Sequence, residues 1–242
     1  MKAYQDINEL SVAVANYITV ISNEAIRVSG RFVIALSGGN TPEKLYSILA
    51  QSPFREQIHW EKTFVFWGDE RCVPLDDTRN NAYRAKLTLL SKVPIPPANI
   101  YRIPVNLSPA KAAIVYQREM NDFFGKSPTR FDLMLLGLGE NGHTASLFPG
   151  TNVLKEEEKG IRDVYVAEEK MHRITMTAPL INLAYHILFL VSGENKAEVL
   201  TKILSGPYNP EQYPAQLISP IDGELRWFVD AEAASHIKTH VI

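Results

Sequence analysis

The feature that most constrains this chain is a short apolar run, Leu133–Leu136, followed at once by three closely spaced glycines. An unbroken apolar run of this length, bounded by an acidic residue and a glycine turn, is typical of a strand buried on both faces of a parallel sheet. Gly137, Gly139 and Gly142 then allow a tight turn and a close approach of the backbone to a ligand. Because ligands of open α/β sheets bind beyond the carboxyl ends of the strands, this turn is a candidate site.

A histidine, His143, follows the last glycine, and we expect it in the first turn of a short helix that Pro149 ends. The glycines also spell the G-x-G-x-x-G pattern of dinucleotide-binding proteins, with an acidic pair at residues 168–169 downstream. That pattern requires a full helix after the turn, and Pro149 leaves too little chain for one. A nicotinamide cofactor is therefore disfavoured. On this stretch alone, a structural turn with a surface histidine stays open.

A second strand and turn precede it along the chain. Phe32–Leu36 predicts a buried strand, and the small residues Ser37, Gly38 and Gly39 lead into an amphipathic run at 43–50. Thr41 and Pro42 suit the cap and first position of that helix. Free backbone N–H groups and the positive helix end attract a phosphate, although the dipole contributes only about 0.3–1 kcal/mol when exposed. We therefore expect basic side chains to assist, with a plain turn as the alternative.

A third polar turn follows the predicted strand at 64–67, where residues 68–71 read Gly-Asp-Glu-Arg. Carboxylates and a guanidinium at the carboxyl end of a strand are a common catalytic or substrate-fixing arrangement in this architecture. Asp69 and Arg71 are therefore candidate site residues, and a solvated charged loop is the alternative. Cys72 lies beside Arg71, which could favour its thiolate, but nothing nearby indicates a thiol enzyme.

Helical and strand-like patterns alternate along the rest of the chain. Helices are expected at 7–25, 81–90, 108–124 and 194–204, and strands at 100–103, 164–167, 174–177, 186–191 and 225–229. Lys196 lies in a first helical turn, where the dipole disfavours a cation and an anionic ligand would offset it. The pattern predicts a single α/β domain over residues 1–242, with a mostly parallel, doubly wound, Rossmann-like sheet flanked by helices.

Composition and absent motifs narrow the function. The 242 residues are 45% hydrophobic and 21% charged, with a formal net charge of −2, so no nucleic-acid or membrane partner is expected. A single cysteine and no apolar leader predict a soluble cytoplasmic protein. There is no G-x-S-x-G motif, and the six histidines show no metal-ligand spacing, so no metal is expected. Three features remain: the predicted phosphate-binding turn, the histidine beside the glycine turn and the Asp-Glu-Arg cluster. Together they suit a reaction in which water attacks a phosphorylated metabolite, or a proton is removed from it, without a cofactor.

Five motifs in order resemble the 6-phosphogluconolactonase family: residues 36–42, 68–71, 137–149, 173–177 and 193–197. The resemblance implies a parallel α/β fold similar to glucosamine-6-phosphate deaminase. It also implies hydrolysis of 6-phospho-D-glucono-1,5-lactone to 6-phosphogluconate in the oxidative pentose phosphate pathway. His143 matches the histidine that activates the attacking water. Asp69 would orient that water or His143, while Arg71 would hold the phosphate or polarise the carbonyl. The matching phosphate-binding positions are Ser37, Gly38, Gly39, Thr41, Arg173 and Lys196.

Two alternatives remain. A glucosamine-6-phosphate deaminase carries Asn-Glu-Pro after the histidine segment, and this chain has Leu-Phe-Pro at 147–149, without the carboxylate. Arg71 also stands where the deaminase usually has an aromatic residue. Asn80 departs from the serine common in the lactonases, which leaves its role open. A non-catalytic sugar-phosphate sensor would usually carry a DNA-binding domain, for which there is no spare length. The expected partner is a phosphorylated sugar lactone, bound by a monomer or weak homodimer.

Overall fold

Six parallel strands form the central sheet of the computed structural model, which describes residues 1–237. Their spatial order is β1-β9-β8-β5-β2-β3, and every neighbouring pair is parallel. The chain adds β3 on one side of β2 and places β5, β8 and β9 on the other, so the order reverses between β2 and β5. This confirms the predicted doubly wound sheet. The strands are β1 (Lys2–Tyr4), β2 (Phe32–Leu36), β3 (Thr63–Trp67), β5 (Leu133–Leu136), β8 (His186–Val191) and β9 (Glu224–Asp230).

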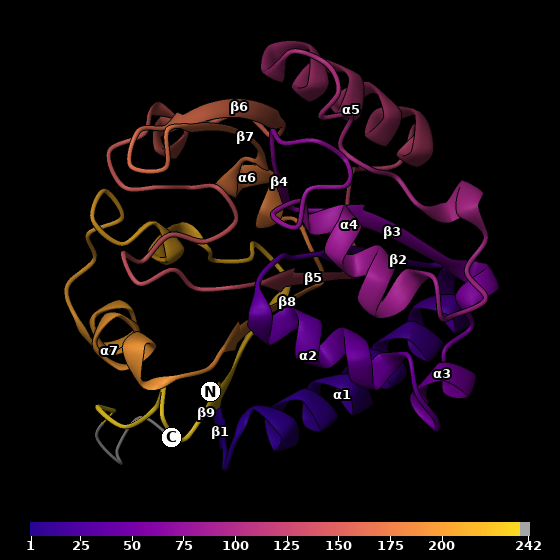
Figure 1. Cartoon of the computed structure of the whole chain (residues 1–242), viewed down its shortest axis with the longest axis horizontal. Coiled ribbons are helices and arrows are strands. Elements are labelled where there is room, and N and C mark those ends of the chain that lie inside the picture. The colour runs from indigo at the N-terminus through magenta and orange to yellow at the C-terminus, as the bar shows by residue number, and fades with distance from the viewer. Residues whose placement is uncertain (238–242) are drawn as a thin grey trace.

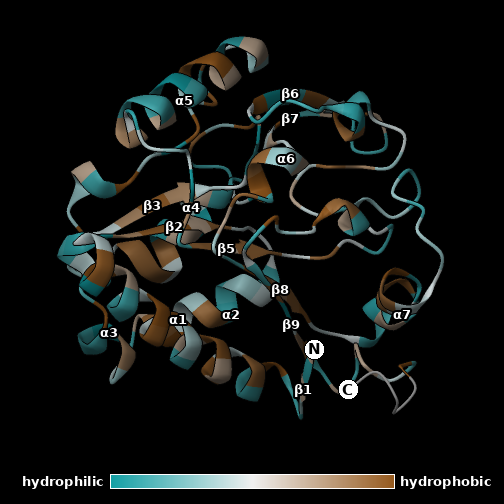
Figure 2. Ribbon diagram, turned by 180° about the vertical axis from the view of Figure 1, so that it is seen from behind, coloured by the Kyte–Doolittle hydropathy of each residue, from teal (hydrophilic) through white to brown (hydrophobic). Residues whose placement is uncertain are grey.

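The apolar runs form strands because helices and a second sheet cover both faces of the central sheet. Every residue of β2 and of β5 is buried, so these strands carry no alternation of apolar and polar residues. Figure 2 shows the hydrophobic colour concentrated on the central strands, while the helices carry both colours. The helices are α1 (Ile7–Ser29), α2 (Asn40–Leu49), α3 (Phe54–Gln57), α4 (Asn81–Ala85), α5 (Pro109–Phe124), α6 (Ala178–Ile181) and α7 (Ala197–Ser205).

The layers are visible in Figure 1, where α1 and α2 lie below the central sheet and α5 lies above it with the smaller sheet. The amphipathic α1 begins at Asp6, whose carboxylate accepts from two backbone N–H groups, and ends at Gly30 in the left-handed region. Helix α5 is tied to β3 by Tyr116, which donates to the carbonyl of Trp67 at 3.1 Å. In residues 1–237, no helix has both the length and the apolarity that a membrane crossing requires.

A smaller antiparallel sheet consists of β4 (Asp69–Arg71), β7 (Met171–Met176) and β6 (Ile161–Val166), in that spatial order. The strands predicted at 164–167 and 174–177 are confirmed as neighbours, with bounds shifted towards the N-terminus. Gly68 joins the two sheets, because its N–H donates to Leu36 and its carbonyl accepts from Met176. The acidic turn expected after β3 is therefore itself a strand, and it pairs Asp69 with Thr175.

Some local predictions are wrong. His143 is not in a helix: its segment forms turns with one isolated bridge, because Ala145 takes a left-handed φ of 47°. With Thr41 as the cap, α2 would begin at Pro42. The helix instead begins two residues earlier, at Asn40, because Gly39 turns the chain with a φ of 105°. The strand expected at 100–103 is reduced to a single bridge, and β1 was not foreseen. Residues 238–242 of the predicted domain lie outside the described part of the chain.

Candidate active site

A cavity of about 430 Å³ lies where β2, β3, β5 and β8 end. Its lining comes from the segments that follow these strands and from β7 of the smaller sheet. Because the carboxyl ends of parallel strands meet at one edge of a sheet, segments far apart in the sequence converge there. The cavity brings together every site residue that the sequence predicts: Ser37, Gly38, Gly39, Thr41, Asp69, Arg71, His143, Arg173 and Lys196.

The turn between β2 and α2 forms one wall of the cavity. The buried Tyr46 of α2 donates to the carbonyl of Ser37 at 2.6 Å and accepts from its N–H at 3.1 Å, which fixes the start of the turn. Gly38 is packed so closely that a Cβ there would lie 1.9 Å from Oδ1 of Asn81. The first N–H groups of α2 have no partners within the helix, so this wall offers donors to an anion.

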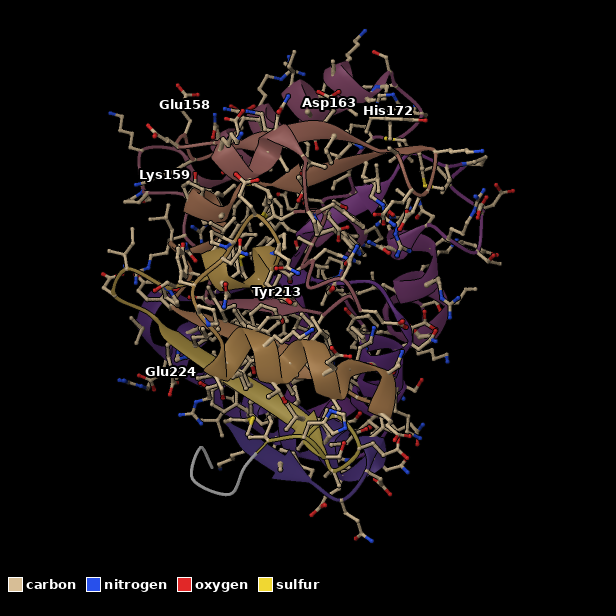
Figure 3. All side chains as sticks on the ribbon, turned by 90° about the vertical axis from the view of Figure 1, so that its left-hand side faces the viewer. Glu158, Lys159, Asp163, His172, Tyr213 and Glu224 are labelled. Carbon is tan, nitrogen blue, oxygen red and sulfur yellow. The ribbon has the colours of Figure 1, made fainter. Side chains whose placement is uncertain are left out.

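The turn after β5 carries His143 and is closed by its own backbone. Gly139 donates to the carbonyl of His143 at 2.8 Å, and Gly142 donates to Gly139 at 3.0 Å. Only glycine fits at Gly139, since a Cβ would lie 2.0 Å from Nδ1 of His143. Gly142 has φ 81°, and a Cβ there would meet Tyr213 at 2.9 Å. Figure 3 shows Tyr213 between the small sheet, marked by His172, and Glu224 of β9.

His143 is held in one tautomer. Its Nδ1 lies 2.6 Å from Oδ1 of Asn141, and an amide oxygen only accepts, so Nδ1 carries the proton and Nε2 keeps its lone pair. Burial, and then the nearby cations Arg173, Lys196 and Arg71, together lower the pKa of His143 to about 3. The imidazole is therefore neutral at physiological pH, which a proton acceptor requires.

Asp69 is fixed on the floor of the cavity and is 5% exposed. Its Oδ2 accepts from the buried hydroxyl of Ser146 at 2.6 Å and lies 3.7 Å from Nη1 of Arg173. Its Oδ1 lies 3.4 Å from the amide nitrogen of Asn81, which also donates to the Asp69 carbonyl at 3.0 Å. These partners hold the carboxylate in place without a contact to His143.

The neighbouring carboxylate, Glu70, does not line the cavity and has a structural role. It accepts from the backbone N–H groups of Arg71, Asn81 and Ala82 at 2.7–2.9 Å and so fixes the start of α4. Its burial raises the pKa to about 7, against the effect of these three donors. Asn80 caps the same helix by accepting from the N–H of Tyr83 at 2.8 Å. The role of Asn80, which the sequence left open, is therefore that of a helix cap.

Three cations face the cavity with different partners. Arg71 donates from Nη1 to the carbonyl of Arg79 at 2.8 Å. Arg173 is 4% exposed and donates to Glu169 through Nε and Nη2, which leaves Nη1 near Asp69.

Lys196 lies in a short 3-10 turn before α7, 3.9 Å from the exposed carboxylate of Glu140. Burial lowers the pKa of Lys196, against the effect of Glu140. A long contact to an exposed carboxylate leaves Lys196 available to an anionic ligand.

Several residues of the site were not foreseen from the sequence. Asn141, Ser146 and Asn81 act through hydrogen bonds to His143 and Asp69, and Phe148 packs on the His143 ring. The short spacing of Asn141 from His143 was the only sequence signal among them. The pKa of Cys72 is raised to about 11, first by burial and then by Glu70, opposite to the shift that a reactive thiolate needs. Within residues 1–237, no three His, Cys, Asp or Glu side chains are grouped to hold a metal.

Comparisons with known proteins give consistent results. Residues 5–227 match a family described as glucosamine-6-phosphate isomerases/6-phosphogluconolactonase. The chain is 43% identical to a 6-phosphogluconolactonase of Synechocystis sp., over 91% of each chain. It is 27% identical to the solved 6-phosphogluconolactonase of Trypanosoma cruzi, with a TM-score of 0.85 over 98% of this chain and 96% of that one. A monomeric glucosamine-6-phosphate deaminase shares the fold, with 23% identity and a TM-score of 0.79 over 97% and 98%.

Proposed function

Since this chain belongs to the family of glucosamine-6-phosphate isomerases and 6-phosphogluconolactonases, we propose that it hydrolyses 6-phospho-D-glucono-1,5-lactone to 6-phosphogluconate. The observation that carries the proposal is the meeting, in one cavity, of a neutral histidine, a helix N-terminus and three cations. A volume of about 430 Å³ lies within the usual range of small-molecule sites, roughly 300–1,000 Å³. The cavity therefore suits a small phosphorylated substrate.

The phosphate would bind at the turn from Ser37 to Thr41, where backbone N–H groups and the α2 terminus supply donors. Lys196 would approach the same phosphate, because its link to Glu140 is long and exposed enough to be exchanged for a dianion. Arg173 would contribute through Nη1, since Nε and Nη2 already donate to Glu169. These contacts anchor one end of the substrate and leave its lactone ring towards His143.

In the chemical step, Nε2 of His143 would remove a proton from water as the water oxygen attacks the lactone carbonyl carbon. The ring C–O bond then breaks, and the same imidazole returns the proton to the departing ring oxygen, so the products are a carboxylic acid and a hydroxyl. Such proton transfer contributes about 10²–10⁴-fold to a rate. Arg71 would stabilise the negative charge that develops on the carbonyl oxygen.

Asp69 has a supporting role in this proposal. Its carboxylate is occupied by Ser146 and faces Arg173, so it would orient that cation rather than touch the attacking water. The enzyme would work without a cofactor, in the cytoplasmic oxidative pentose phosphate pathway, as a monomer or weak homodimer. Its partner would be the phosphorylated lactone, with no nucleic acid or membrane involved.

The deaminase alternative is disfavoured by the residue that packs against the base. Phe148 is buried and apolar, so its side chain has no proton to exchange during ring opening and amine loss. A non-catalytic sensor would bind sugar phosphates in the same cavity without turning them over. A deaminase would release ammonia from glucosamine 6-phosphate, and a sensor would form no product, so both differ from the lactonase in a product assay.

The test is a hydrolysis assay with the purified chain and freshly prepared 6-phosphogluconolactone, corrected for spontaneous hydrolysis. We expect a rate of 6-phosphogluconate formation that is proportional to the concentration of the chain. Glucosamine 6-phosphate, assayed for ammonia release, serves as the control for the deaminase. Saturable phosphosugar binding with no acceleration would favour the sensor and contradict the proposal.

A further inference from the structure

The aromatic side chain of Phe148 contacts both the base and one of the cations but does not line the cavity. Its ring is stacked on the imidazole of His143, with centroids 3.9 Å apart and an interplanar angle of 17°. The guanidinium carbon of Arg173 lies 5.1 Å from the centroid of the same ring. Phe148 is 3% exposed, so substrate cannot reach it. One apolar side chain is thus shared by two groups that the proposed reaction needs.

The ring of Phe148 restricts a tilt of the His143 imidazole that the hydrogen bonds of His143 would allow. Asn141 fixes the position of Nδ1, but a single hydrogen bond allows the imidazole to tilt about the line between the two atoms. A ring stacked at 3.9 Å opposes that tilt, because it would either clash with Phe148 or open a gap beside it. The direction of the Nε2 lone pair depends on this tilt.

The same contact orients Arg173. The faces of an aromatic ring carry partial negative charge and attract a guanidinium, while Glu169 and Asp69 hold its nitrogen atoms. Displacement of the Phe148 ring would therefore disturb both the base and the cation that faces the substrate. The phenyl ring of Phe148 carries no carboxylate or hydroxyl, so it can influence the reaction only through the positions of His143 and Arg173.

We propose that Phe148 is a positioning residue, whose ring fixes the plane of the His143 imidazole relative to the substrate that Arg173 helps to anchor. The inference rests on the proposed lactone hydrolysis for its kinetic consequences. Its structural content concerns the orientation of His143 and can be measured without any substrate.

The kinetic test replaces Phe148 with leucine, which is apolar and similar in size but has no ring. A small displacement of a reacting group can lower a rate by about 100-fold, so we expect kcat of Phe148→Leu to fall by about 10- to 100-fold. KM should rise by a smaller factor, because Glu169 and Asp69 still hold the guanidinium of Arg173. Phe148→Tyr keeps the ring and should restore most of kcat. Phe189→Leu is the matched control, since Phe189 is buried and stacked on Trp227 at 3.9 Å outside the cavity lining. It should retain kcat even if it unfolds more easily.

A pH profile separates positioning from a general loss of folded protein. In Phe148→Leu the freed imidazole gains contact with water, so the acid limb of kcat/KM should move up towards the ordinary histidine value of about 6.5. Loss of folded protein alone would lower kcat/KM by the same factor at every pH and would not move its acid limb. Wild-type kcat with an unmoved limb, or equal losses in the leucine and tyrosine variants, would overturn the inference.

NMR of the wild-type chain provides a test that needs neither substrate nor a Phe148 variant. The ring protons of His143, assigned by their loss in His143→Gln, should be shifted upfield by the stacked Phe148 ring. Ring protons at ordinary positions would contradict the stacking and with it the inference. If the upfield shift is present but no lactone hydrolysis is detected, the proposed function fails and the orientation of His143 by Phe148 stands.

Discussion

At the scale of single residues, His143 combines two properties that oppose each other. Burial and three nearby cations keep its imidazole neutral, which a base requires, but the same effects make it a weaker proton acceptor. Under the proposed function, a phosphorylated substrate would relieve this opposition. Its dianion would neutralise part of the charge on Lys196 and Arg173, and the proton affinity of His143 would rise only in the complex.

The pH dependence of the rate should reflect the low pKa of His143. With a pKa of about 3 in the free enzyme, His143 stays neutral well below pH 6.5, so kcat/KM should be level through that range and fall only nearer pH 3. The acid limb of kcat, which reports the complex, should lie at higher pH than that of kcat/KM. Steady-state assays from about pH 3 to about pH 8 cover both limbs.

Unfolding must be followed in the same buffers. The unfolded chain takes up a proton on this histidine near pH 6.5 and the folded chain does not, so the folded state loses stability as the pH falls from about 6.5 towards about 3. Circular dichroism at each pH identifies the range in which the rates refer to folded enzyme. A kcat/KM limb at pH 6.5 in folded protein would show that the base is not the buried, neutral imidazole.

Lys196 gives a second prediction at this scale. Hydrogen bonds to charged groups contribute about 1.5–3 kcal/mol, so Lys196→Met should raise KM for the lactone by about 10- to 150-fold and change kcat little. Lys202→Met is the matched control, because Lys202 pairs with the exposed Glu198 on α7 outside the cavity lining. An unchanged KM in Lys196→Met would place the phosphate elsewhere in the cavity.

At the scale of elements, the turn between β2 and α2 depends on Gly38 for contact with α4. A Cβ at this position would lie 1.9 Å from Oδ1 of Asn81, the residue whose amide holds Asp69. Gly38→Ala should therefore lower the free energy of unfolding by about 1–3 kcal/mol through overpacking, and should lower activity by displacing Asn81. Urea unfolding and the hydrolysis assay measure the two effects.

Gly125→Ala is the control for this substitution. Gly125 follows α5 with φ 60° and ψ −124° and has no atom within 4 Å of the added Cβ, so alanine there should cost about 1–3 kcal/mol of backbone strain and leave activity unchanged. Equal activity in the two variants would mean that the contact between the turn and α4 does not matter to the site.

At the scale of the whole molecule, the sequence predicts the central sheet because burial on both faces leaves a direct pattern of apolar runs. It fails where a partner distant in the sequence decides the structure. β1 exists because it pairs with β9 at the other end of the chain, and β4 is polar because α4 and β7 supply the partners of its carboxylates. The turn at His143 is held partly by Ser146, whose backbone N–H donates to the hydroxyl oxygen of Thr175.

For the site, too, the sequence predicts some residues and misses those that only contacts in the folded chain distinguish. Charged side chains and glycines at the ends of strands are visible in the sequence, and the cavity contains all those that were predicted. Asn141, Ser146 and Phe148 were missed because amides, hydroxyls and aromatic rings are common everywhere, and only three-dimensional contact distinguishes these from the rest. Sequence patterns therefore predict which groups line the cavity better than they predict which groups orient them.

The most direct test of the account is the hydrolysis rate of the purified His143→Ala variant beside the wild-type chain, each corrected for spontaneous hydrolysis. Phosphosugar affinity, measured on both by calorimetry, verifies that the variant keeps its cavity. We predict that kcat falls by about 10²–10⁴-fold while KM and phosphosugar affinity stay close to those of the wild type. A folded His143→Ala variant that hydrolyses the lactone at the wild-type rate would contradict the central claim that this imidazole activates the attacking water.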